Sequence, residues 1–395
     1  MYKKILAITF AVMFLASILS VGSTITPAFA VKQNNHHKNH LPKLSDKIPF
    51  GTNNIFGITF GNLSDVAVNE NNHRVYAVAN DTVYVIDGKT DSFITSIPIG
   101  LGAGSIIVNE KTNRIYVANS GSGIDSGIFQ NFNGTVSVID GKTNAIIDTI
   151  PVNNDNLNGI GVNEKTNRIY VNGYYNHTSS VIDGNTDKVI DTFPLLYEPG
   201  YPIINEKTNK IYELNYGTPL PNGTIDYDGN VEVFNGKTDK HISTIGVDGA
   251  PTSVALNEKT DKLYVSSEVD GTVTVIDGKT NTVIDDVSVS DYTYGVAASE
   301  SLNKIYVTNT LKSTLSVING NTDKVLDTVP FGTPTPSCFF KGTCFDLGTW
   351  PSRVTIDDKL GQIYVLGSAD GILYVFDTLT HHKIGEIHMG HGNHH

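Results

Sequence analysis

One repeated stretch constrains the fold of this chain more than any other feature of its sequence. It consists of Asn-Glu-Lys-Thr-Asn-Arg-Ile-Tyr-Val at residues 109–117. Close and looser copies begin at residues 69, 109, 163, 205, 257, 299 and 357. A tyrosine keeps its place in every copy: Tyr76, Tyr116, Tyr170, Tyr212, Tyr264, Tyr306 and Tyr364. Seven copies of one unit predict a single repeat architecture in place of two or three separate domains.

Each repeat contains four short segments with strand-like patterns. In the second repeat they are expected at 106–109, 114–119, 135–140 and 145–152, which are rich in Val, Ile and Thr. The last two are joined through Asp140-Gly141, and Asp-Gly between apolar runs is a hairpin signal. Four strands in a repeat of about 40 residues are typical of a propeller blade. The sequence therefore predicts an all-β fold, a seven-bladed β-propeller of four-stranded antiparallel blades preceded by a signal peptide.

Two segments carry a family resemblance. Ile-Tyr-Val-Ala-Asn at 115–119 and Val-Ser-Val-Ile-Asp-Gly-Lys-Thr-Asn at 136–144 resemble the YVTN family of seven-bladed β-propeller repeat proteins. The resemblance covers roughly residues 60–390. It implies an exported or cell-surface protein with a binding role more than a catalytic one.

Three places depart from this repeat pattern. They are residues 357–362 in blade 7, Ser179-Ser180 in blade 3, and Glu213 in blade 4, where most repeats have valine. We expect less regular blades at these places. Glu213 is expected either to line a polar pocket or to lie at a frayed strand end.

The first thirty residues have the pattern of a secretory signal peptide. Lys3 and Lys4 precede an apolar run at 5–19, and Ala28-Phe29-Ala30 forms a small-x-small cleavage site. An uncleaved membrane anchor is the alternative. The expected divisions are a signal peptide at 1–30, a His/Asn-rich disordered leader at 31–43, the propeller at 44–390 and the end of a His-rich tail at 391–395. No second apolar run is long enough to span a bilayer, so we expect a secreted or extracytoplasmic protein, with cell-surface association as one option.

The net charge limits the classes of expected partner, and the two cysteines indicate the expected redox chemistry. The formal net charge is -12, and removal of residues 1–30 takes away two lysines and no acids, which leaves -14. A surface this acidic repels phosphate backbones, so nucleic acid is not an expected partner. Cys338 and Cys344 are close together in one loop, and in an exported protein we expect them to form a disulfide. A redox-active pair is less favoured, because the spacing is not Cys-x2-Cys.

Long insertions interrupt the repeat on one predicted face of the disc. Turns alternate between the two faces of a blade, so the repeated Asn-Glu-Lys-Thr-Asn and Asp-Gly-Lys-Thr turns share one face. Insertions at 120–134, 216–230 and 331–351 fall on the other. Loops on a rigid scaffold carry function, and aromatic rings supply contact area. The candidates for a ligand face are Phe129, Phe132, Tyr174, Tyr175, Tyr201, Tyr227, Tyr292, Tyr294, Phe339, Phe340 and Trp350. The alternative is that these loops pack over their own aromatic residues.

Histidines gather toward the two ends of the chain, which hold nine of the 12. Imidazole and thioether groups on glycine-spaced tails suit copper or zinc. The candidate metal ligands are His36, His37, His40, His381, His382, His388, Met389, His391, His394 and His395. An extracytoplasmic protein that handles copper or zinc is therefore the alternative function.

Signals of catalysis are weak. The sequence shows no Gly-x-Ser-x-Gly motif and no glycine-rich phosphate loop, and no catalytic residue is nominated. A lyase or oxidoreductase housed in the propeller channel would need clustered titratable groups at the channel mouth. The first strands, judged by 66–68, 160–162 and 254–256, do not supply them. The sequence therefore favours an exported, non-enzymatic binding or surface protein whose partner is a cell-envelope protein, peptide or glycan.

Overall fold

The structure is a computed structural model that covers most of the chain between residues 52 and 389. The described residues are 52–55, 58–61, 63–79, 81–121, 134–152, 156–196, 198–219, 225–226, 228–247, 249–290, 292–332, 336–339, 343–346 and 349–389. The predicted signal peptide, leader and tail end lie outside them. Within these ranges no helix is long and apolar enough to cross a membrane.

Seven four-stranded sheets follow one another along the described chain. The strands of blades 1 to 4 are β3 (Leu63–Asn69), β4 (Arg74–Ala79), β5 (Thr82–Asp87), β6 (Ser92–Pro98); β7 (Ala103–Asn109), β8 (Arg114–Asn119), β9 (Thr135–Asp140), β10 (Ala145–Pro151); β11 (Leu157–Asn163), β12 (Arg168–Gly173), β13 (Thr178–Asp183), β14 (Lys188–Pro194); β15 (Pro199–Asn205), β16 (Lys210–Asn215), β19 (Gly229–Asn235) and β20 (Lys240–Val247). Those of blades 5 to 7 are β21 (Pro251–Asn257), β22 (Lys262–Ser267), β23 (Thr272–Asp277), β24 (Thr282–Ser288); β25 (Thr293–Ser299), β26 (Lys304–Asn309), β27 (Thr314–Asn319), β28 (Lys324–Pro330); β31 (Pro351–Asp357), β32 (Gln362–Gly367), β33 (Ile372–Asp377) and β34 (Lys383–His388). Short hairpins pair β1 (Thr52–Ile55) with β2 (Ile58–Gly61), β17 (Thr218–Pro219) with β18 (Ile225–Asp226), and β29 (Pro336–Phe339) with β30 (Thr343–Asp346).

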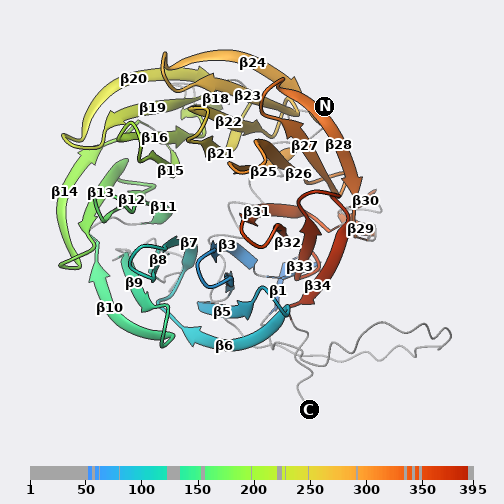
Figure 1. Cartoon of the computed structure of the whole chain (residues 1–395), viewed down its shortest axis with the longest axis horizontal. Coiled ribbons are helices and arrows are strands. Elements are labelled where there is room, and N and C mark those ends of the chain that lie inside the picture. Colours follow the sequence, from blue (N-terminus) through green and yellow to red (C-terminus); the bar gives the residue numbers. More distant parts are fainter. Residues whose placement is uncertain are drawn as a thin grey trace.

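The seven sheets stand around a central channel, as Figure 1 shows. Within each sheet the strands pair antiparallel in chain order, and the first strand of each blade lies innermost. The predicted seven-bladed propeller of four-stranded blades is confirmed. The expected irregularity in blades 3 and 4 is wrong, because β12 pairs with β13, and β16 with β19, without any register shift.

The hydrophobic core lies between blades. In blade 2, β8 and β9 bury nearly every residue, whereas β10 exposes all but Ile150. The two middle strands of a blade are buried on both faces because a neighbouring sheet covers each face, which explains their continuous apolar runs. Full burial of one Val, Leu or Ile side chain contributes about 1.5–3 kcal/mol. Stacking the blades therefore supplies the stability that a single blade lacks.

The repeated tyrosines join each blade to the next. All seven are 0% exposed. The Tyr212 hydroxyl donates to the Gly278 carbonyl at 3.4 Å, and Tyr306 donates to the Thr378 carbonyl at 3.0 Å, in each case in the following blade. The cation at the start of the second strand reaches the same kind of turn, since Arg114 Nη1 donates to the Gly184 carbonyl at 2.9 Å. The conserved spacing of the repeat is thus explained by packing between blades.

Turn chemistry accounts for the Asn and Asp residues of the repeat. Asn113, Asn144 and Asp187 adopt φ between 53° and 57°, which is the left-handed region that Asn and Asp tolerate best among residues with a side chain. A Cβ added at Gly141 would lie 2.8 Å from the Asn113 carbonyl oxygen. Glycine is required there because the third turn packs directly against the first.

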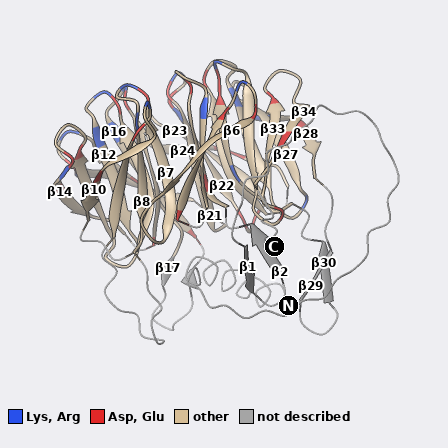
Figure 2. Cartoon of the chain, turned by 90° about the horizontal axis from the view of Figure 1, so that it is seen from below, with Lys and Arg blue, Asp and Glu red and all other residues tan. Residues whose placement is uncertain are grey.

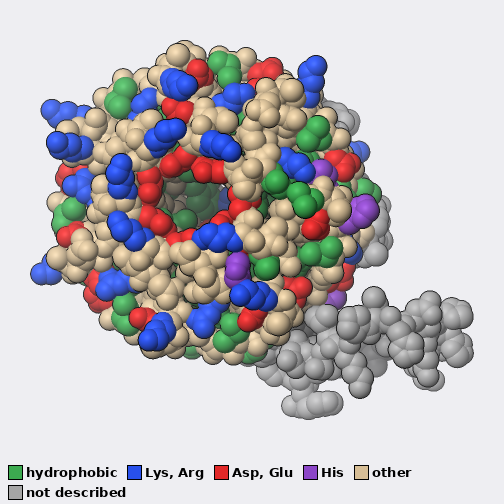
Figure 3. Space-filling model, in the orientation of Figure 1, with side chains coloured by type: hydrophobic (Ala, Val, Ile, Leu, Met, Phe, Trp, Pro, Cys, Tyr) green, Lys and Arg blue, Asp and Glu red, His purple; other side chains and the backbone are tan. Residues whose placement is uncertain are grey.

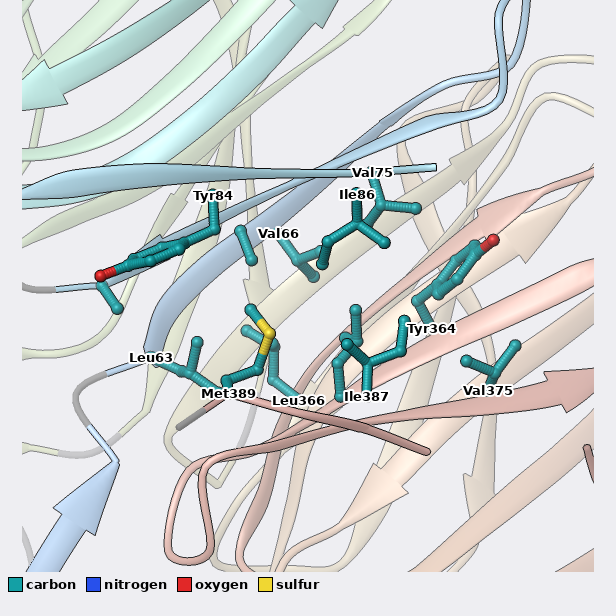
Figure 4. Close-up of a cluster of buried hydrophobic side chains, with 13 residues drawn as sticks. Leu63, Val66, Val75, Tyr84, Ile86, Tyr364, Leu366, Val375, Ile387 and Met389 are labelled. Carbon is teal, nitrogen blue, oxygen red and sulfur yellow. The ribbon is translucent and has the colours of Figure 1, made fainter. Parts of the chain in front are cut away.

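The ring closes between blades 7 and 1 by side-chain packing. Blade 7 takes all four of its strands from residues 351–388. Figure 4 shows the buried cluster at this seam, with Leu63, Val66 and Ile86 of blade 1 against Leu366 and Ile387 of blade 7. His73 Nδ1 also lies 2.8 Å from Asp357 Oδ2 across the seam. The segment 44–50, proposed as a possible outer strand here, lies outside the described residues.

Candidate ligand site at one mouth of the channel

The two faces of the disc differ in composition. Figure 2 shows that Lys, Arg, Asp and Glu residues are concentrated in the short turns on one face. These turns join the first strand to the second and the third to the fourth, and we call this the turn face. The connections between second and third strands, together with the crossovers between blades, lie on the opposite face. All three long insertions interrupt those connections, so we call it the insertion face.

An arginine from blade 7 lies inside the channel near the insertion face. Arg353 is the third residue of β31, and its guanidinium carbon lies 4.0 Å from the ring centroid of Tyr201 in blade 4. The same atom lies 5.4 Å from the ring of Tyr294 in blade 6. A contact between blades 7 and 4 crosses the ring, so these side chains meet within the channel. Stacking of a guanidinium on an aromatic face contributes about 0.5–2 kcal/mol.

One carboxylate balances the charge of Arg353. Asp65 Oδ1 of blade 1 lies 3.9 Å from Arg353 Nε, and both side chains are 12% exposed. Asp65 accepts hydrogen bonds from the Val66 amide at 2.9 Å, and from the Ser105 hydroxyl and Ile106 amide at 3.1 Å each. Burial raises the pKa of Asp65, while Arg353 and these donors act in the opposite direction. Asp65 therefore accepts three hydrogen bonds from other groups and balances the charge of Arg353 from beyond hydrogen-bond distance.

Neutral hydroxyls surround the pair. Burial raises the pKa of Tyr201, Tyr216 and Tyr294, although the Arg353 charge opposes the shift in each case. These phenols consequently stay protonated near neutral pH and can donate as well as accept. Glu268 adds a carboxyl that is 3% exposed, and burial raises its pKa to about 7. The mouth thus combines one cation, aromatic faces, neutral hydroxyls and two carboxyls. We call Asp65, Tyr201, Tyr216, Tyr294 and Arg353 the mouth cluster.

Sequence reasoning found two members of the mouth cluster and missed the others. Tyr201 and Tyr294 were predicted for the ligand face, and the structure brings them together on Arg353. The expectation that the first strands supply no clustered titratable groups is wrong. It rested on the apolar second halves of those strands, whereas Asp65 and Arg353 lie in the first halves. An alignment of the repeat copies at the position four residues before each copy begins would have found Asp65 and Arg353. The residues at that position are Asp65, Ser105, Gly159, Tyr201, Ser253, Gly295 and Arg353.

The opposite mouth is ringed by acids. Each first turn carries a carboxylate, and the Glu206 amide donates to Glu258 Oε1 at 2.5 Å while the Glu258 amide donates to Glu300 Oε1 at 2.8 Å. The series closes where the Asp358 amide donates to Glu70 Oε1 at 3.2 Å. Its members, the acid ring, are Glu70, Glu110, Glu164, Glu206, Glu258, Glu300 and Asp358. Figure 3 shows acidic side chains around the central opening on this face. Burial raises the pKa of Glu70 to about 7.

The remaining ligand-face candidates are spread over the insertion face. Tyr174 and Tyr175 contact each other edge to face with ring centroids 5.4 Å apart, and Tyr175 is 38% exposed. Tyr292 and Trp350 both adopt positive φ, at 60° and 48°. Phe129, Phe132, Tyr227 and Phe340 lie outside the described residues, as does the side chain of Phe339. The backbones of Cys338 and Cys344 are register partners in the β29–β30 hairpin, and their disulfide stays a prediction.

Four of the predicted metal ligands lie in or beside the strands of blade 7 and not in a tail: His381, His382, His388 and Met389. Met389 is 2% exposed within the core between blades 7 and 1, so its thioether is enclosed by apolar side chains. His381 closes the last turn of blade 7, where Nδ1 lies 3.1 Å from Asp327 Oδ2 and Nε2 lies 2.8 Å from Lys304 Nζ. His382 and His388 are exposed. No group of three potential metal ligands gathers in the described part of the chain. His36, His37, His40, His391, His394 and His395 fall outside it.

Glu213 is the centre of a buried polar cluster between blades 3 and 4. It is 0% exposed, and Asn172 Nδ2 of blade 3 donates to its Oε2 at 2.6 Å. Glu232 lies opposite Glu213 in register, and Ser179 lies opposite Asn172. Burial raises the pKa of Glu213 to about 8, against the effect of Asn172, and the charge of Glu232 adds to the rise. Of the two expectations for Glu213, the frayed strand end is wrong.

Comparisons with known proteins support the fold alone. No protein-family model matches the sequence, and no curated protein matches it. Among solved structures, the chain is similar to hydrazine synthase from Kuenenia stuttgartiensis. The TM-score is 0.65 at 14% sequence identity, over 81% of this chain and 96% of that chain. Likeness at such low identity shows a shared propeller architecture.

Proposed function

We propose that this chain is an exported, non-enzymatic binding protein that recognises its ligand on the insertion face, with the mouth cluster at the centre of that face. The observation that carries the proposal is the convergence of Tyr201 and Tyr294 on Arg353 within the channel. At the position that Tyr201 and Arg353 share, the other blades carry the smaller residues Asp65, Ser105, Gly159, Ser253 and Gly295. A scaffold that needed only to close its channel has no requirement for a cation among them.

The sequence supports the remaining parts of this proposal. The N-terminal pattern indicates export, and the repeat resemblance to YVTN proteins favours a surface role. The partner class is a cell-envelope protein, peptide or glycan. The insertions enlarge the face around the mouth cluster, and loops on a rigid scaffold are the usual place for recognition.

Retention on cell-envelope material tests the binding role. The double variant Tyr175→Ala/Trp350→Ala removes two aromatic rings from the insertion face, and we expect retention to fall at least about tenfold. Leu326→Ala is the matched control, because Leu326 is 52% exposed on the outer strand β28, away from both mouths. Equal retention of all three proteins, with unchanged melting temperatures, would reject the proposal.

A catalytic use of the channel is the second candidate, favoured by the titratable groups found there. Glu268 has a pKa raised to about 7 by burial, which is the range of a general acid or base. This hypothesis predicts an enzymatic activity, and it predicts that the pH dependence of the rate changes in the Glu268→Gln variant. Absence of any such shift removes Glu268 from a catalytic role.

Metal handling by the histidine tails stays a separate alternative. Elemental analysis of the native protein beside a variant that lacks residues 31–43 and 391–395 tests it. Metal in the first protein and none in the second would support copper or zinc binding.

A further inference from the structure

Within the mouth cluster, the hydrogen bonds of the described residues do not use all the N–H donors of Arg353. A guanidinium has five N–H donors and no acceptor. Asp65 Oδ1 lies 3.9 Å from Arg353 Nε, which is beyond hydrogen-bond range, and Asp65 is already engaged by three other donors. The Tyr216 hydroxyl is a hydrogen-bond partner of Arg353 and engages one of the five donors. Charge is therefore balanced at this place while hydrogen-bonding capacity remains.

The side chain of Arg353 is held in one place by its neighbours. Its guanidinium lies 4.0 Å from the Tyr201 ring and 5.4 Å from the Tyr294 ring, and only 12% of the side chain is exposed. A guanidinium fixed between aromatic faces loses little further freedom when it binds a partner. Low local dielectric also strengthens any charge-assisted hydrogen bond formed there.

The two mouths of the channel would treat an anion differently. The acid ring at the turn face places seven carboxylates around one opening, which repels negative charge. The insertion-face mouth carries Arg353 among neutral hydroxyls, with the Asp65 carboxylate beside it and the buried Glu268 carboxyl in the same mouth. The insertion-face mouth, with two carboxyls and one cation, therefore opposes the approach of an anion to Arg353 less than the acid ring does.

We propose that Arg353 is the anchor of a subsite for a single carboxylate group, which enters from the insertion face and pairs with the guanidinium. The Tyr201, Tyr216 and Tyr294 hydroxyls are within the same cluster and supply neutral partners for the remainder of the group. A carboxylate matches the planar fork of arginine in a bidentate pair. The inference rests on the proposed binding function and names the chemistry of its ligand. A carboxylate of this kind can come from an acidic sugar or from a peptide terminus.

Matched pairs of small probes separate these sources. One arm compares glucuronate with glucose, and the other compares an N-acetylated tripeptide acid with its amide, by ligand-observed NMR or calorimetric titration on the full mature protein. We expect at least one carboxylate probe to bind, and its neutral counterpart to bind at least tenfold more weakly. Binding in one arm alone identifies the source. Failure of both carboxylate probes overturns the inference.

Substitution at Arg353 tests the anchor itself. Arg353→Lys keeps the charge beside Asp65 but loses the planar fork, so we expect at least tenfold weaker binding of the carboxylate probe. Tyr216→Phe removes one hydroxyl and little volume, so it should weaken binding of the carboxylate probe by a smaller factor. This variant provides the test if Arg353→Lys fails to fold. Glu206→Gln in the acid ring is the control and should bind as the wild type does. If Arg353→Lys folds and binds the probe as the wild type does, the inference is overturned. If Arg353→Lys does not fold, unchanged binding by Tyr216→Phe overturns it.

The two proposals fail in different ways. If the aromatic variants of the insertion face lose retention on envelope material while no carboxylate probe binds, the binding function stands and the carboxylate subsite is wrong. If carboxylate binding depends on Arg353 while retention is unaffected by the aromatic variants, the subsite stands and its assignment to an envelope partner is wrong.

Discussion

The two mouths of the channel are built on opposite principles. At the turn face, every blade contributes an acidic residue at the same place in its first turn, and each carboxylate of the acid ring accepts from the backbone of a neighbouring blade. At the insertion face, the equivalent positions carry Asp, Ser, Gly, Tyr and Arg, and no two neighbouring blades match. The sevenfold repetition closes the ring, because each copy makes equivalent packing contacts with the next blade. Loss of repetition marks the place where one particular set of side chains is required.

This comparison predicts that single substitutions cost more at the irregular mouth. Arg353→Met removes the only cation that balances Asp65 within the described residues and leaves a buried carboxylate. We expect a loss of about 3 kcal/mol in the free energy of unfolding. Asp65→Asn in the same chain should recover part of that loss, since the uncompensated charge is gone although the amide nitrogen faces a donor that the carboxylate accepted. Urea unfolding of the single and double variants measures both effects, and additive losses would contradict the pairing.

The buried polar cluster between blades 3 and 4 offers a second contrast, through its dependence on pH. Burial raises the pKa of Glu213 from 4.5 to about 8, so the folded state retains a proton that the unfolded state has lost between these values. The stabilising effect of the neutral carboxyl is complete below pH about 4.5 and is lost as the pH rises through about 8. Glu213→Gln mimics the neutral form at every pH. We expect it to exceed the wild type in stability by about 2–4 kcal/mol at pH 9.

Thermal unfolding between pH 5 and pH 9 checks this expectation. The advantage of Glu213→Gln should shrink as the pH falls. Glu258→Gln in the acid ring serves as the comparison, because its turn is repeated in the other blades and its side chain is less enclosed. Parallel curves for the wild type and Glu213→Gln would contradict the assignment of the titration to Glu213.

The regular mouth should show the smallest effect. Glu206→Ala removes the oxygen that accepts the Glu164 amide, and we expect a loss of about 1–2 kcal/mol. Glu206→Gln keeps an acceptor and should lose less than half of that. Denaturant unfolding at neutral pH distinguishes the two. Equal losses would show that the charge, and not the hydrogen bond, matters in the ring.

The repeated parts of the molecule could be predicted from the sequence, and the irregular mouth could be predicted only in part. The fold was predictable because local signals such as Asp140-Gly141 and the tyrosines recur with one spacing, and each copy reinforces the others. The site was harder, since Asp65, Tyr201 and Arg353 are separated by more than 100 residues at each step and become neighbours only when the ring closes. Glu213 was recognised as unusual, but its partner Asn172 belongs to another blade. Met389 was misassigned because a thioether near histidines resembles a ligand, whereas its burial depends on the seam with blade 1.

The seam between blades 7 and 1 has a consequence for how such a ring can change over time. Tyr364 reaches the Gly88 carbonyl across the seam as Tyr306 reaches the Thr378 carbonyl across the preceding interface. Within the described residues, no blade borrows a strand from another part of the chain. The stretch of sequence that is copied and the module that packs are therefore the same. Duplication, exchange or circular permutation at any crossover would leave every sheet whole, which lets one blade diverge at the mouth while its neighbours preserve the ring.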